Sequence, residues 1–197
     1  MHPSTTALIL IGFQNDYFSP TGALYPVVEA FVPQVLANTL ATLEGLKHTA
    51  TTILSTPILF TPDYSELSDP VGILKIIKDN QAFRAGTPGG NTIAELQAYG
   101  ERIATIPGKR GLTAFSNTEL AEELHRRGIT DVVLLGVVTS LCIESTAREA
   151  FEKGYRVHIV SDATAGRTDF EQQFYCSEIF PMYADVVDHR QLVAALA

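Results

Sequence analysis

Residues 131–163, DVVLLGVVTSLCIESTAREAFEKGYRVHIVSDA, contain the pattern that decides the fold. The apolar run at 131–138 predicts a buried strand, and residues 139–154 predict a helix that ends at Gly154. Residues 155–163 predict a second strand. Continuous apolar strands separated by helices are typical of a parallel sheet that is covered on both faces.

The same alternation runs through the rest of the chain. Further strands are predicted at residues 7–11, 57–60, 102–106 and 184–188. Further helices are predicted at 27–47, 71–78, 117–128 with Asn117 as N-cap, from about 169, and at the C-terminal end. We therefore predict a three-layer α/β/α sandwich with a mainly parallel sheet, as one domain that spans residues 1–197.

Composition and charge narrow the class of protein. With 46% apolar and 18% charged residues, the chain has the profile of a compact globular protein. Its formal charge of -8 argues against nucleic acid or an anionic membrane as the main partner. Because no signal-peptide pattern is visible, we expect a cytoplasmic protein, in which Cys142 and Cys176 stay free thiols.

In a parallel α/β sheet, ligands bind at the carboxyl ends of the strands. The segments that follow the predicted strands are 12–18, 61–64, 107–115, 136–142 and 161–168. These segments are the candidates for the walls of a site.

Cys142 lies in the first turn of a predicted helix. Free backbone N–H groups and the helix dipole stabilise a thiolate there, and the same N–H groups can hold an oxyanion. The alternative is a small buried hydrophobe, the fate of most free cysteines. The apolar stripe of this helix begins at Ile143, whereas Cys142 shares a face with Thr146 and Glu149, so a reactive thiol and a packing residue both remain open. Cys176 is expected to serve packing only.

Lys109 follows a predicted strand and a glycine, which places it at the same edge of the sheet. A cation at this position can stabilise a thiolate. Most loop lysines are instead solvated, and Arg110 is an equally good candidate from the residues alone.

Four motifs occur together along the chain: LILIGFQNDYF, KRGLTAF, GVVTSLCIESTAREAFEKGYRV and VSDATA. In this order they resemble the isochorismatase-like cysteine hydrolases, a superfamily that includes nicotinamidases, carbamoyl-group amidases and isochorismatase. The resemblance covers nearly the whole chain. It implies a hydrolase that acts on the C–N bond of a small amide, with water as second substrate and without a cofactor.

The resemblance also implies roles for single residues. Cys142 matches the family's nucleophile and Lys109 the lysine that supports it. A cis peptide bond between Val137 and Val138 would place the Val138 N–H beside that of Cys142 as an oxyanion hole. The residues that we expect to contribute to substrate binding are Tyr17, Gln14, Asp63 and Phe115.

Gly12 departs from the family pattern, because the family has its catalytic Asp two residues before the matching Gln14. That carboxylate takes the thiol proton and later activates water. Asp16 or Asp63 could replace it, or the glycine could be an introduced change. The third alternative is a natural variant that binds or senses a small molecule, or forms a covalent adduct, without efficient turnover. If only the carboxylate is missing, a Gly12→Asp variant should gain amidase activity by orders of magnitude.

Metal binding is not expected. Nicotinamidases hold a metal with an Asp and two His after the second strand, whereas the matching stretch here, TPDYSELSDP, has no histidine. The five histidines show no ligand spacing, and His158 is expected to be structural.

The resemblance further implies a homodimer or a homotetramer.

Overall fold

The computed structural model describes all 197 residues and contains one six-stranded sheet. The strand order is β3-β2-β1-β4-β5-β6, and all neighbouring strands are parallel. The strands are β1 Thr6–Ile11, β2 Thr52–Thr56, β3 Ala104–Thr105, β4 Asp131–Val137, β5 Arg156–Ala165 and β6 Asp185–Val187. The helices are α1 Asn15–Phe18, α2 Val32–Leu46, α3 Gly72–Asp79, α4 Ala94–Gln97, α5 Leu120–Arg126, α6 Glu144–Glu152, α7 Asp169–Phe174 and α8 His189–Leu196.

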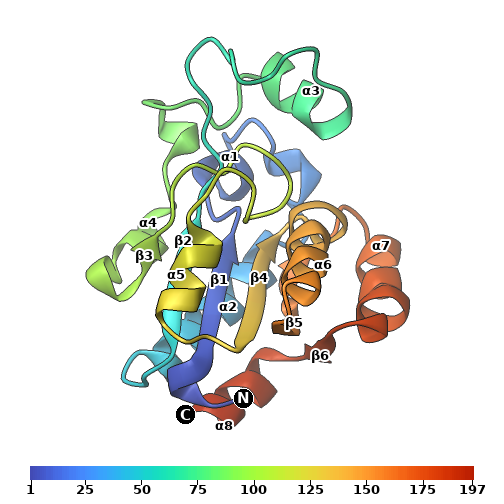
Figure 1. Ribbon diagram of the computed structural model, residues 1–197. Helices are drawn as coiled ribbons and strands as arrows, with labels where there is room; N and C mark the ends of the chain where they lie inside the picture. The colour runs from blue at the N-terminus through green and yellow to red at the C-terminus, as the bar shows by residue number, and fades with distance from the viewer.

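Helices cover both faces of this sheet, as Figure 1 shows with α2 behind β1 and with α5 and α6 in front. Successive side chains of a strand point to opposite faces. Leu8 and Leu10 of β1 therefore pack in one apolar cluster with α2 and α8, while Ile9 and Ile11 pack in a second cluster with α5 and α6. The predicted three-layer sandwich with a parallel sheet is confirmed.

The second strand differs from its prediction. It runs over Thr52–Thr56 instead of residues 57–60. Pro57 has no N–H to donate to a ladder. Both backbone groups of Ile58 are bonded by the side chain of Gln14, at 2.9 Å each, so they are unavailable to a neighbouring strand. The third strand is also shorter than predicted, with only Ala104–Thr105 paired.

Two helices begin later than predicted. Helix α2 starts at Val32, because Pro33 suits the first turn of a helix and the preceding residues form a separate 3₁₀ turn. Helix α5 starts at Leu120, and the prediction of Asn117 as its N-cap is wrong. Asn117 has a left-handed φ of 60°, and the hydroxyl of Thr118 accepts the Leu120 N–H at 3.3 Å.

Three predictions about single residues are confirmed. Both cysteines are free thiols. His158 is buried between Asp131 and Asp185, with ring nitrogens 3.1 and 3.3 Å from their carboxylates, which is a structural role. The peptide bond between Val137 and Val138 is cis.

None of the helices combines the length and apolar character needed to cross a bilayer.

Candidate active site

A small cavity lies at the carboxyl edge of the sheet, where β1, β2 and β4 end. The space open to the centre of a water-sized sphere is about 10 Å³, so the cavity holds at least one water molecule. Five of the lining residues are polar, a thiol or glycine: Gly12, Tyr17, Thr56, Lys109 and Cys142. The other lining residues are Ile11, Ile58, Ile73, Leu74, Ile77, Leu112, Val137 and Leu141.

Cys142 reaches this cavity from a π-helical turn, Thr139–Ile143, between β4 and α6. The turn begins directly after the cis peptide, and the carbonyl of Val138 accepts the N–H groups of Leu141 and Ile143 at 3.0 and 3.2 Å. The side chain of Thr139 is tied to Gln172 at 2.6 Å, which anchors the turn to α7. Cys142 is 8% exposed and lines the cavity while also touching the α5/α6 cluster, so both sequence interpretations describe part of its position.

Lys109 is the cation beside the thiol. Its side chain is buried, with Nζ 3.5 Å from Cys142 Sγ and hydrogen-bonded to the carbonyl oxygen of Gly111. Arg110, the other candidate, points away and forms an ion pair with Glu66 at 3.2 Å. Of the two cations that the sequence left open, Lys109 is therefore the one that lies beside the thiol.

Gly12 directly follows β1 at the cavity wall and has a φ of +76°. A Cβ at this position would lie 2.8 Å from the carbonyl oxygen of Val137 and 2.9 Å from its Cγ2. Real Cβ atoms do not approach backbone atoms this closely, and L side chains rarely adopt this φ. The backbone here is therefore shaped for glycine.

Neither candidate replacement for the missing carboxylate faces the thiol. Asp16 is buried, and its two oxygens accept the N–H groups of Ala23 at 3.1 Å and Phe83 at 2.6 Å. Asp63 lies at the surface, where hydrogen bonds from the Thr61 hydroxyl and from Ser65 keep its carboxyl pKa below the usual value. No Asp or Glu lines the cavity, and the only side-chain hydrogen bond to Cys142 Sγ comes from Lys109.

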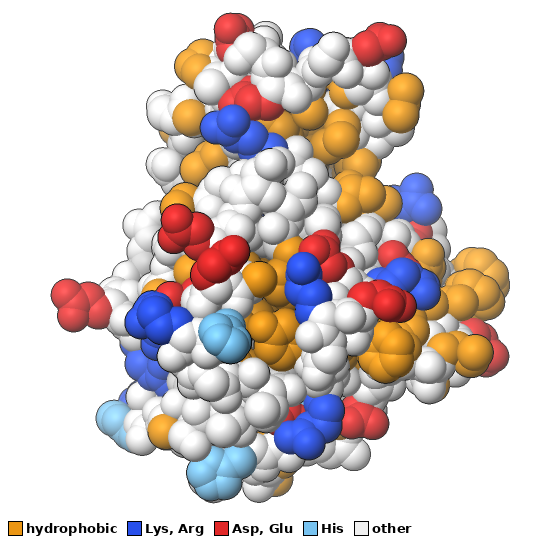
Figure 2. All heavy atoms as spheres, in the orientation of Figure 1, with side chains coloured by type: hydrophobic (Ala, Val, Ile, Leu, Met, Phe, Trp, Pro, Cys, Tyr) orange, Lys and Arg blue, Asp and Glu red, His pale blue; other side chains and the backbone are white.

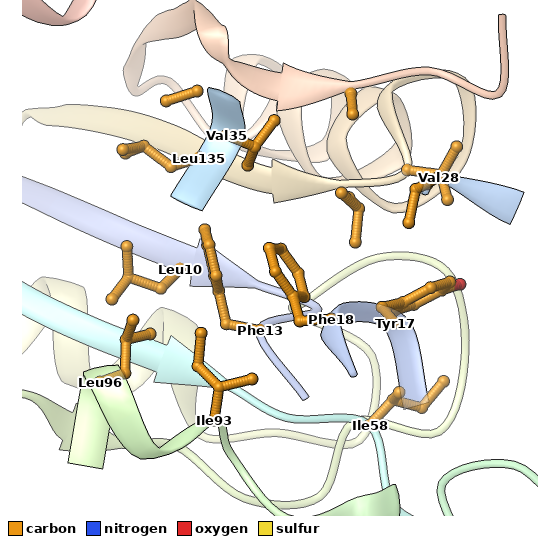
Figure 3. Packing of buried hydrophobic residues seen from close by; sticks show 14 of the residues in the cluster. Leu10, Phe13, Tyr17, Phe18, Val28, Val35, Ile58, Ile93, Leu96 and Leu135 are labelled. Carbon is orange, nitrogen blue, oxygen red and sulfur yellow. The ribbon is translucent and has the colours of Figure 1, made fainter. Parts of the chain in front are cut away.

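Of the predicted substrate-binding residues, Tyr17 alone lines the cavity. Burial, followed by the nearby Cys142 and Asp16, raises the pKa of the Tyr17 phenol, so its hydroxyl stays neutral. Figure 3 shows this hydroxyl at the rim of the packed cluster, beyond the ring of Phe18. Its position suits a contact with a ligand.

The structure places Gln14 and Phe115 elsewhere. The Gln14 amide donates to the carbonyls of Ile58 at 2.9 Å and Gly90 at 2.7 Å, so it ties two loops together. Phe115 packs in the α5/α6 cluster with its ring 6.4 Å from that of Tyr155. Asp63 does not line the cavity either.

Two parts of the cavity wall are not predicted from the sequence. Helix α3 lies over the carboxyl edge of the sheet (Figure 1) and lines the cavity through Ile73, Leu74 and Ile77. The sequence does not identify Thr56, because it predicts the second strand at residues 57–60 and the structure has it at Thr52–Thr56. With the strand at its observed position, the rule that sites form at carboxyl ends would have selected Thr56.

The residues after β2 do not form a metal site. Asp63 is surrounded by Thr61 and Ser65, and Glu66 is paired with Arg110. No group of three or more His, Cys, Asp or Glu side chains converges anywhere in the structure.

The fold and site together define an α/β protein with a buried cysteine–lysine pair at the carboxyl edge of a parallel sheet. The chain belongs to the isochorismatase family, since the family model described as "Isochorismatase domain" matches residues 6–191. It is 31% identical to Nicotinamidase 3 of Arabidopsis thaliana over 159 residues, which cover 81% of this chain and 72% of that protein. It is 30% identical to the maleamate amidohydrolase of Pseudomonas putida over 197 residues, covering 96% of this chain and 86% of that one.

A solved structure supports the fold independently. The cysteine hydrolase from Pseudomonas syringae pv. phaseolicola superimposes with a TM-score of 0.85 at 22% identity, over 98% of this chain and 93% of that chain.

Proposed function

We propose that this protein hydrolyses the C–N bond of a small amide through a covalent acyl-enzyme on Cys142. The observation that carries the proposal is the 3.5 Å separation of Lys109 Nζ and Cys142 Sγ in a nearly closed, mostly apolar cavity. Two relatives bear the names of amide-hydrolysing enzymes, a nicotinamidase and an amidohydrolase, which supports this substrate class.

The chemistry follows from the buried cation. A buried ammonium is unfavourable unless it is paired, and a Cys142 thiolate supplies the pair for Lys109. In the proposed reaction the thiolate attacks the amide carbonyl carbon and forms a C–S bond, with the oxyanion held by the N–H groups of Val138 and Cys142. The C–N bond then breaks, and the leaving amine takes a proton from the Lys109 ammonium.

Water completes the reaction. Its oxygen attacks the thioester carbon and its proton passes to the neutral Lys109 amine, after which the C–S bond breaks. The carboxylic acid leaves, and the thiolate and ammonium are restored. Lys109 thus carries the proton that a carboxylate at position 12 would otherwise carry.

Variants of the pair test this proposal. Cys142→Ala should abolish hydrolysis in a panel of small amides. Lys109→Met should reduce it by about 10²–10⁴-fold, the usual effect of losing an acid–base group. Lys109→Arg keeps the charge but holds its proton too tightly to transfer it, so Cys142 alkylation should persist while turnover fails. Full turnover by Lys109→Arg would contradict the proton-carrying role.

A second candidate function is favoured by the position of Gly12. Because no carboxylate lines the cavity, the protein could bind a small molecule or hold it as a stable adduct on Cys142 without turnover. Intact-protein mass spectrometry distinguishes the two functions. An adduct that forms once and persists for hours supports binding or sensing, whereas an adduct that turns over supports the hydrolase.

A further inference from the structure

Thr56 is a buried polar residue on the wall of the cavity, outside the cysteine–lysine pair. Its side chain is fully buried and its hydroxyl has no hydrogen-bond partner. The other buried side-chain atoms without a partner are Thr39 Oγ1, Thr51 Oγ1 and Tyr183 OH, and none of these residues lines the cavity. Because an unpaired buried hydroxyl is unfavourable, its position on the wall of a site indicates a partner that binds there.

The register of the sheet explains which way Thr56 faces. In the β1–β2 ladder, Thr56 pairs with Ile11, which is the residue directly before Gly12. Side chains at paired positions lie on the same face of a sheet. Ile11 faces the cluster that includes Cys142, so the Thr56 hydroxyl is directed to the same side as the thiol.

The polar groups in the cavity suit a bound water molecule, and the cavity has room for one. The centre of a water-sized sphere can move within about 10 Å³ of the cavity, so at least one water fits. A buried water also needs two to four polar partners. Lys109 directs N–H groups at the Gly111 carbonyl and at Cys142 Sγ. Because an ammonium has three N–H donors, one remains for a further partner.

We propose that the Thr56 hydroxyl and the Lys109 ammonium hold a single water molecule beside Cys142, and that Thr56 positions this water for hydrolysis of the acyl-enzyme. The proposal rests on the function proposed above. The water oxygen forms the new bond to the acyl carbon, its proton passes to the neutral amine of Lys109, and the C–S bond breaks to release the thiolate. Thr56 only accepts or donates a hydrogen bond and exchanges no proton, so it is a positioning residue.

The test compares Thr56→Val, which removes the hydroxyl at nearly constant shape, with Thr56→Ser, which keeps it. Thr39→Val is a matched control, because Thr39 in α2 also carries a buried hydroxyl without a partner but lies away from the cavity. A short-chain p-nitroanilide or p-nitrophenyl ester reports acylation as a burst of chromophore and deacylation as the steady rate that follows.

Thr56→Val should leave the burst rate within about 2-fold of the wild type, lower the steady rate by about 10–100-fold, and accumulate the acyl-enzyme mass, since misplacing one reactant costs up to about 100-fold. Thr56→Ser should restore the steady rate and Thr39→Val should not change it. Equal loss of burst and steady rates, or no loss of either, in Thr56→Val would overturn the positioning role.

Crystallography of the free protein gives a readout that is independent of activity. Electron density for a water within hydrogen-bond distance of Thr56 Oγ1 and Lys109 Nζ is expected in the wild type and should be lost in Thr56→Val. A wild-type site without this water would overturn the proposed water site. A wild type that holds the water but never forms an acyl-enzyme would instead overturn the proposed function, and with it the deacylation role.

Discussion

Replacing Gly12 by Asp, the simplest way to rebuild the family's acid, should harm this protein. The new Cβ would lie 2.8 Å from the Val137 carbonyl oxygen, and the backbone would have to keep a φ of +76°. A left-handed conformation costs a residue with a Cβ about 1–2 kcal/mol. Overpacking a tight site costs about 1–3 kcal/mol. Together, Gly12→Asp should lower the free energy of unfolding by about 2–5 kcal/mol.

Thermal unfolding and hydrolysis assays measure the two consequences. For a chain of this size, each kcal/mol lowers Tm by about 2–4 °C, so we expect a drop of about 4–20 °C. Gly12→Ala is the matched control, because it adds the same Cβ without a carboxylate. Both variants should lose stability to a similar extent, and neither should exceed the wild-type rate.

This expectation differs from the large gain of activity predicted from the sequence, because the sequence alone does not reveal the conformation of Gly12. A Gly12→Asp protein with an unchanged Tm and a hydrolysis rate raised about 100-fold over Gly12→Ala, the effect of one general base, would refute the reasoning. It would mean that the end of β1 shifts readily and that the site lacks only the carboxylate.

Three further predictions concern stability, thiol reactivity and the cavity wall. The Arg156 guanidinium holds the pKa of buried Asp131 far below its ordinary value, so this carboxylate stabilises the fold fully above about pH 5 and progressively less as the pH falls below the unfolded value of about 4. Asp131→Asn should therefore cost about 2–3 kcal/mol in urea unfolding at pH 7, with a smaller difference from the wild type at pH 3. Burial raises the pKa of Cys176 to about 11, so at neutral pH iodoacetamide should leave this thiol nearly unlabelled, as peptide mapping would show. Ile77→Ala should enlarge the cavity and raise kcat/KM for longer acyl chains relative to acetyl by about 10-fold, whereas Ile76→Ala, at a half-exposed position of the same helix, should not change this ratio.

Much of the fold could be predicted because its signals are local. The apolar runs of β1 and β4 identify buried strands, and the alternation of strands and helices identifies a parallel sheet. The pairing of Cys142 with a lysine was expected because both residues follow strands, and the carboxyl ends of parallel strands meet at one edge. The family resemblance distinguishes Lys109 from Arg110, but their positions in the sequence do not, because both cations follow the same strand and the fold of the loop decides which one reaches the thiol.

The remaining features depend on contacts between distant parts of the chain. Gln14 looks like a site residue beside Tyr17, but its amide is used by the backbone of Ile58 and Gly90. Thr56 lies directly before the strand predicted at residues 57–60, and only its pairing with Ile11 places it at the end of β2. Helix α3 has the amphipathic pattern of any surface helix. Figure 2 shows apolar side chains at the surface of the region around it, and Val71 and Ile76 are exposed there. Only the folded structure shows that Ile73, Leu74 and Ile77 are the α3 residues that line the cavity.

The charges around Cys142 indicate which substrates the proposed reaction can accept. A Cys142 thiolate and the Lys109 ammonium sum to zero, and the cavity lining contains no other acidic residue, arginine or histidine. A third charge would therefore be buried without a partner, which is strongly unfavourable. The carboxylate that Gly12→Asp introduces would be such a charge, and a carboxylate on the acyl part of a substrate is another. Between two amides of equal size, the neutral one should have a kcat/KM at least about 100-fold higher than the carboxylate-bearing one, a difference of about 2.7 kcal/mol. Equal rates for the two amides would show that a cation outside the cavity reaches the bound substrate.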